Sequence, residues 1–142
     1  MKRASILLML TMVVIGIGMH PPPAHAVEFE VIRANLNRMT SVEWHAYAKS
    51  LEGQRVSWTG RVHDVQEKWF LGFYVFVEME AGGGTDVSLQ DVPEALAKSL
   101  RKGQVVHFSG RIDSVWTVLG SLDVFLREVS VTAVGPKSSV EN

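Results

Sequence analysis

Three of the five histidines could serve as metal ligands together with nearby carboxylates. His63 and His107 fall at outward positions of two alternating segments, Asp64 and Asp113 lie close to them in sequence, and His45 lies in a helical segment. Zinc sites bring histidines and carboxylates together at short, recurrent spacings. These residues share no such spacing, so we interpret them as surface histidines and predict no metal site and no cofactor.

The carboxylates and arginines offer a second kind of chemistry. Glu78 and Glu80 share one face of a predicted strand, where a carboxylate pair could do acid–base work or could protect a strand edge. Arg61 and Arg111 are suggestive of a nuclease, but no carboxylate cluster accompanies them. Gly82–Gly84 lacks the Lys-Ser/Thr of a phosphate loop and is typical of a turn. We predict no catalytic residue, and a hydrolase is the least favoured class.

Aromatic residues provide the strongest indication of a binding site. Trp69 and Phe70 lie in one predicted loop, and Trp116 and Leu119 lie in another. Clustered exposed apolar side chains mark interaction sites, and aromatic rings stack on bases or sugars or anchor a protein partner. The alternative is that these residues extend the core, or cover it where the N-terminal helices pack, because large aromatics are usually mostly buried.

The predicted binding set adds two arginines that could neutralise an anionic ligand. It comprises Trp69, Phe70, Trp116, Leu119, Arg61 and Arg111.

The first 26 residues have the layout of a secretory signal peptide. Lys2 and Arg3 precede the apolar run Ile6–Met19, and Ala24-His25-Ala26 is a small-x-small cleavage site. The run is shorter than the roughly 20 residues that span a bilayer, although an uncleaved anchor is the alternative. No cysteine follows it, which excludes a lipoprotein anchor. We expect cleavage after Ala26, a periplasmic or secreted protein, and no stable membrane anchor afterwards.

Cleavage changes the charge and so the expected partners. It removes two basic residues and no acidic one, so the net charge moves from -1 to -3. Nucleic-acid binding needs the opposite sign, which disfavours that class of partner. The chain has no cysteine and therefore forms no disulfide, so the mature domain must depend on core packing alone.

Two helices are predicted in an N-terminal extension, residues 27–52. Apolar residues repeat at helical spacing through 28–39. Thr40 and Glu43 then form a capping box, Trp44 opens an apolar stripe, and Gly53 suits a left-handed helix end.

After Gly53 the apolar period changes from about 3.6 residues to 2, which indicates strands. We expect strands at 56–63, 73–80, 86–90, 105–115 and 122–134. A helix over Pro93–Leu100, capped by Asp91, should separate the third strand from the fourth.

A gapless internal repeat relates two of these strands. Gly53–Val65 aligns with Gly103–Val115, and a glycine lies midway in each copy, Gly60 and Gly110. Gene duplication is one explanation, but we favour similar structural demand on two long strands. A mid-strand glycine marks a sharp bend, which lets one strand serve two sides of a closed barrel.

This order of elements resembles the OB-fold, a five-stranded Greek-key barrel with a helix between strands three and four. The pattern Gly-x-x-Val-x-x-x-Gly-x-Val, and a later segment over Leu100–Gly110, is similar to bacterial exported domains related to the tRNA-anticodon-binding OB group. The resemblance covers Gly53–Val134 and implies a mainly β barrel. We assign the barrel to residues 53–136, which Gly135-Pro136 ends, and expect a disordered tail over 137–142.

The fold leaves the activity open, because OB-folds have many functions. We expect an exported binding module whose partner is a protein of the cell envelope. The alternative is an oligosaccharide or single-stranded nucleic acid, bound through the loops between strands one and two and between strands four and five. Binding through phosphates should weaken steeply with salt, whereas an apolar protein interface should not.

Overall fold

The computed structural model describes residues 26–80 and 84–134. The predicted signal peptide up to residue 25, the glycines Gly82 and Gly83 and the tail lie outside the described residues. The helices and strands, in chain order, are α1 Phe29–Arg38, α2 Ser41–Leu51, β1 Arg55–Lys68, β2 Gly72–Glu78, β3 Val87–Val92, α3 Glu94–Ser99, β4 Val105–Val118 and β5 Ser121–Ala133.

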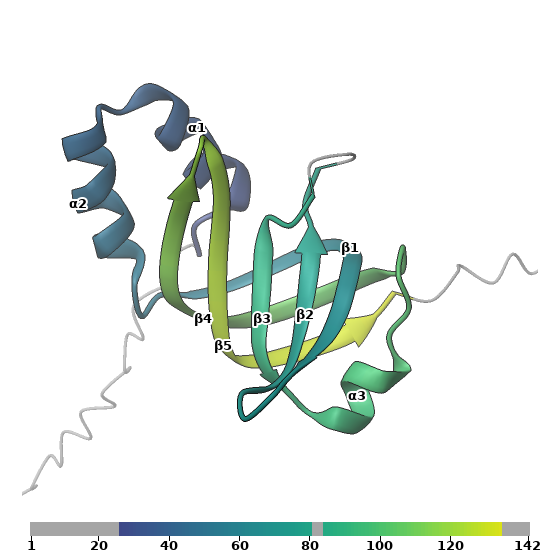
Figure 1. The fold of residues 1–142 in the computed structure, drawn as a ribbon. Coiled ribbons are helices and arrows are strands. Elements are labelled where there is room, and N and C mark those ends of the chain that lie inside the picture. The colour runs from purple at the N-terminus through teal and green to yellow at the C-terminus, as the bar shows by residue number, and fades with distance from the viewer. Residues whose placement is uncertain (1–25, 81–83, 135–142) are drawn as a thin grey trace, which may run out of the picture.

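The five strands close into a barrel in the order β1-β2-β3-β5-β4 (Figure 1). Only β3 and β5 run parallel, and every other pair is antiparallel. The first half of β1 pairs with β4 and its second half with β2. The predicted fold is confirmed: a mainly β barrel with a helix between its third and fourth strands and helices before the first.

The N-terminal helices share the core of the barrel. Phe29 and Ile32 of α1 are fully buried, and the Phe29 ring meets Trp58 of β1 edge-on. The predicted capping box starts α2, because the Thr40 side chain accepts from the Glu43 amide and the Glu43 carboxylate accepts from the Thr40 amide. Figure 1 shows α1 and α2 gathered beside the β4–β5 hairpin, with α3 at the opposite end of the barrel.

Both mid-strand glycines lie where a side chain would collide with a neighbouring strand. A Cβ on Gly60 would lie 2.5 Å from Val77 Cγ1, and one on Gly110 would lie 3.0 Å from the Arg127 carbonyl oxygen. Gly110 also coincides with a bulge, because the register of β4 against β5 shifts between Ser109 and Arg111. A side chain at Gly60 would therefore force Val77 to shift, and one at Gly110 would need β5 to give by a few tenths of an ångström.

Two local predictions were wrong. Asp91 does not cap α3: Pro93 occupies the N-cap position, and Asp91 adopts a left-handed backbone with φ of 52° at the end of β3. The fourth strand does not end at Val115 but continues to Val118, so Trp116 lies in a strand and not in a loop. The β-branched residues Thr117 and Val118 favour this extension.

Candidate functional site

The first apolar tip is the turn between β1 and β2, which we call tip 1. Its residues are Trp69, Phe70 and Leu71, of which Trp69 is 84% and Phe70 86% exposed. The two rings pack on each other with centroids 4.0 Å apart. Phe70 has a φ of 64°, in the left-handed region that glycine and asparagine favour. Tip 1 therefore presents two large rings to solvent, and one of them, Phe70, has a backbone conformation that is unfavourable for a bulky residue.

The second apolar tip, tip 2, ends the β4–β5 hairpin. Val118 pairs with Ser121, so the turn has only two residues, Leu119 and Gly120, both with positive φ. This is the type I′ geometry that Asn-Gly satisfies best. Leu119 instead projects fully exposed, at 102%, and Trp116 on the adjoining strand is 60% exposed. The alternative that these rings extend the core is excluded for both tips.

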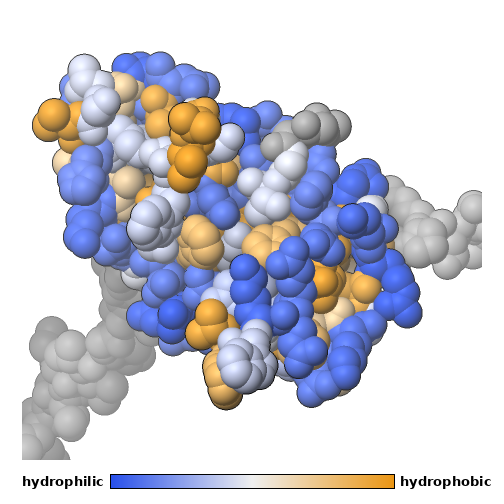
Figure 2. Space-filling view, in the orientation of Figure 1, coloured by the Kyte–Doolittle hydropathy of each residue, from blue (hydrophilic) through white to orange (hydrophobic). Residues whose placement is uncertain are grey.

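A sheet face joins the two tips, as Figure 2 shows by its apolar surface at both tips and between them. On this face Phe76 of β2 lies beside Ser88 of β3, which lies beside Phe125 of β5. Lys68 Nζ lies 5.3 Å from the centroid of Tyr74 and 5.5 Å from that of Phe76. This aromatic face was not predicted, because β2 is apolar on both faces and its alternation is hidden.

Buried polar groups lie behind the rings of this face. The Ser88 hydroxyl donates to the Asp123 carboxylate at 3.0 Å. Burial raises the pKa of Asp123, the hydrogen bond from Ser88 opposes that rise, and the nearby charge of Asp86 adds to it. Asp86 itself accepts from Arg33 of α1 at 2.7 Å. An ion pair between Arg33 and Asp86 thus holds the helical extension against the edge of the same face.

The two predicted arginines do not join the aromatic residues. Arg61 donates to the Gly103 carbonyl oxygen at 2.8 Å, and Arg111 forms an ion pair with Glu128 at 3.5 Å. Arg111 is paired across the ladder with Arg55, whereas Arg61 is paired with Val105 at the other end of the same ladder. The two guanidinium groups are therefore separated along the barrel and already have partners.

The histidines and carboxylates are also dispersed. His107 contacts the hydroxyls of Ser57 and Thr59 at 2.9 and 3.0 Å, and His63 lies 3.9 Å from Glu78. Glu80 lies beyond the end of β2 and pairs with Arg33. Within residues 26–80 and 84–134, no group of three histidine, aspartate or glutamate side chains is placed to hold a metal ion.

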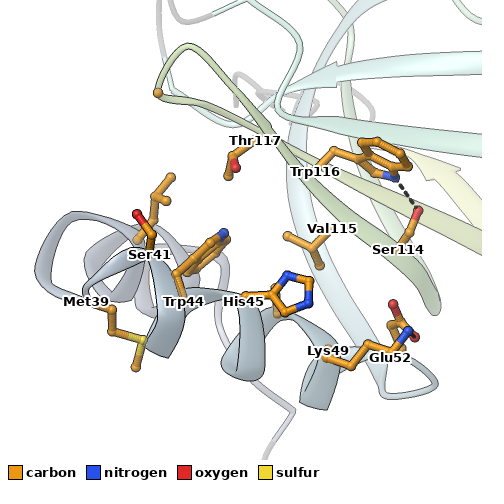
Figure 3. Close-up of a pocket in the computed structure, with 13 residues that line it drawn as sticks. Met39, Ser41, Trp44, His45, Lys49, Glu52, Ser114, Val115, Trp116 and Thr117 are labelled. Carbon is orange, nitrogen blue, oxygen red and sulfur yellow. Dashed lines mark hydrogen bonds and ion pairs between the residues drawn. The ribbon is translucent and has the colours of Figure 1, made fainter.

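A groove of about 610 Å³ lies between the helical extension and the β4–β5 hairpin (Figure 3). Trp44 and His45 of α2 point toward the strand, and four consecutive β4 residues, Ser114 to Thr117, line the other side. The Trp116 indole donates to the Ser114 hydroxyl at 3.0 Å. Sequence reasoning could not find this groove, because it depends on how α2 docks against a strand some seventy residues later.

The closed five-stranded barrel, with α3 between β3 and β4, is an OB-fold. No family model and no curated protein matches the chain.

Among solved structures, the chain is similar to an OBody bound to hen egg-white lysozyme. The identity is 21%, the match covers 65% of this chain and 88% of that chain, and the TM-score is 0.43. It is also similar to the mitochondrial single-stranded DNA binding protein Rim1 of S. cerevisiae, with 15% identity, coverage of 61% and 100%, and a TM-score of 0.36. The fold assignment rests on the barrel topology, and the narrower resemblance to exported anticodon-binding-like domains stays a prediction.

No helix in the described part of the chain is long and apolar enough to cross a membrane.

Proposed function

We propose that this protein is an exported binding module that captures a protein partner through its two apolar tips and the aromatic face between them. The observation that carries the proposal is the exposure of large apolar side chains at both tips. Monomeric domains rarely gather such residues at protruding turns without a partner to cover them.

The backbone at the tips strengthens this argument. Phe70 and Leu119 occupy left-handed conformations, which are unfavourable for bulky residues. Neither side chain is buried, so core packing does not compensate, and the Phe70 ring contacts the equally exposed ring of Trp69. Local sequence preferences that are violated without a folding benefit are expected at functional positions. A binding role accounts for apolar residues where asparagine or glycine would fold better.

The decisive experiment replaces both exposed tryptophans, Trp69→Ser and Trp116→Ser, in one chain. Because both side chains are exposed, each change should shift the free energy of unfolding by only about 0.5 kcal/mol. Capture of a partner from the cell-envelope fraction of the host should be lost. Urea denaturation and affinity capture, run on the same preparation, measure the two quantities.

The matched control is Val134→Ser, another exposed apolar residue, at the far end of β5 from tip 2. This variant should capture the partner as the unaltered chain does. Equal capture by the double tryptophan variant would contradict the proposal, and so would the absence of any partner specific to the unaltered chain.

A second candidate function is supported by the aromatic face itself. Tyr74, Phe76 and Phe125 lie on the strands that join the tips, and such rings can stack on bases or sugars. Lys68 and Arg127 are basic neighbours, but Arg127 already pairs with Asp113 at 3.3 Å. Binding of a fluorescent single-stranded oligonucleotide that weakens steeply between 50 and 200 mM salt would favour this candidate.

A further inference from the structure

The second half of β4 has a strand neighbour on one side only. β1 pairs with β4 from Val105 to Arg111, whereas β5 pairs with it as far as Val118. The last backbone bonds on the β1 side are made by Ile112, which donates to the Gln54 carbonyl oxygen at 2.8 Å and accepts from Gly53. Beyond Ile112, the β1-side edge of β4 has no strand partner among the described residues.

The ladder register shows which backbone groups this open edge presents. In an antiparallel pair, successive residues direct their N–H and C=O groups alternately toward and away from the partner strand. Val118 closes the two-residue turn and bonds to β5, so Trp116 and Ser114 do the same. Val115 and Thr117 therefore point their backbone groups away from β5, and no backbone partner meets them in the described chain.

These free backbone groups face the groove described above. Four consecutive β4 residues line it, although their side chains alternate between the two faces of the strand. A groove lined in that way follows the edge of the strand. Helix α2 forms the opposite wall, in which Trp44 and Ala48 are largely buried and His45 and Lys49 are exposed polar groups (Figure 3).

The groove therefore combines the elements of strand addition. Main-chain donors and acceptors lie on one side and a mixed apolar and polar helix on the other, so backbone bonds can supply affinity and alternate side chains specificity. The open edge, residues 113–118, is about 20 Å long at the usual strand rise of about 3.3 Å per residue. The volume of the groove lies within the roughly 300–1,000 Å³ typical of ligand sites.

We propose that the groove between α2 and β4 binds an extended peptide segment of the partner, which adds to β4 as a sixth strand. The added strand bonds to the backbone of Val115 and Thr117 and places alternate side chains against the α2 wall of the groove, where His45 and Lys49 are exposed. This inference rests on the proposed capture of a protein, and it names the form in which that partner binds. The β5-facing bonds of β4 are unaffected.

The probe is a random twelve-residue peptide library displayed on phage and selected against the purified full chain. Selected peptides are synthesised, and their dissociation constants are measured by calorimetry. Amide hydrogen exchange then reports on the backbone directly. On binding, exchange at Val115 and Thr117 should slow by at least about tenfold. A peptide docked only through side chains would leave those two amides unchanged and would overturn the proposal.

The matched variants are Thr117→Pro and Thr117→Val. Proline removes one N–H at the open edge and spares the ladder, a position where strands tolerate it. Valine keeps the N–H and changes the same side chain. We expect Thr117→Pro to weaken peptide binding about tenfold or more, the effect of a lost hydrogen bond, and Thr117→Val to bind nearly as the unaltered chain. Equal binding by the two variants would overturn the proposal.

The outcomes separate this proposal from capture through the tips. Failure to select any peptide, or selection of peptides that bind Thr117→Pro unchanged, defeats strand addition alone. If peptides bind the edge but no envelope protein is captured, the proposed function fails, whereas peptide binding in the groove stays supported. Should Thr117→Pro not fold, exchange at Val115 and Thr117 in the unaltered chain still decides the matter.

Discussion

At each of the two tips, one bulky residue has a backbone conformation that is unfavourable for its side chain. Leu119 has a φ of 50° and Phe70 one of 64°, and each is followed within two residues by a glycine that also has a positive φ. For residues with a Cβ, the left-handed conformation costs roughly 1–2 kcal/mol. Because no buried contact offsets that cost, the two residues lower stability, which supports the proposed binding role.

Replacing Leu119 by asparagine should make the protein more stable. Asparagine tolerates the left-handed conformation and, with Gly120, completes the preferred Asn-Gly type I′ turn. We expect Leu119→Asn to raise the free energy of unfolding by up to about 1 kcal/mol, measured by urea denaturation. Partner capture should fall in the same variant.

The control at this position is Leu119→Val, which keeps an apolar side chain but is β-branched. Such residues are the least tolerant of positive φ, so this variant should be less stable than the unaltered chain. A stability order in which valine exceeds asparagine would show that the turn is not strained and would remove one support for the binding role.

At the scale of the strands, the two glycines make the bends of the barrel. Gly60→Val and Gly110→Val should each lower the free energy of unfolding by at least about 1–3 kcal/mol, the usual cost of overpacking. Val77, which a new Cβ on Gly60 would meet, is fully buried and has little room to move. A regular strand would tolerate valine, so unchanged urea midpoints in both variants would contradict the bend argument.

Local patterns predicted the strands well where one face is buried. Val56, Trp58 and Val62 alternate cleanly with exposed residues, and β1 follows that pattern. The signal failed where alternation was absent: the last residues of β4 are not buried on either face, so Trp116 was wrongly placed in a loop. The aromatic face was not predicted because Phe76 lies between two buried valines, Val75 and Val77, so no polar residue marks the outer face of the strand.

The groove and the open edge of β4 depend on tertiary placement. The pairing of β1 with β4 stops at Arg111 because its partner, Arg55, is the first residue of β1, and the chain before β1 belongs to α2, which packs on this side of β4. No local pattern around Thr117 carries that information. The sequence did predict the two tips, because large apolar residues beside turn-forming residues can be recognised without knowledge of the fold.

At the scale of the whole molecule, the helical extension belongs to the same core as the barrel. Phe29 packs on Trp58, and Arg33 bridges Asp86 and Glu80 at 2.7 and 3.0 Å. The extension caps one end of the barrel and also builds the wall of the groove. Stability and the proposed binding site therefore depend on the same two helices.

The predicted start of the mature chain, Val27, is compatible with the same packing. The Trp58 indole donates to the Val27 carbonyl oxygen at 3.0 Å, whereas Ala26 is exposed. Cleavage after Ala26 would thus remove no packed residue of the described chain. The small residue Ala26 is also accessible to the signal peptidase. We expect N-terminal sequencing of the protein from the cell envelope to begin at Val27. Ala26→Trp should accumulate the uncut precursor, and an intact Met1 or Lys2 terminus on inner-membrane protein would contradict export by cleavage.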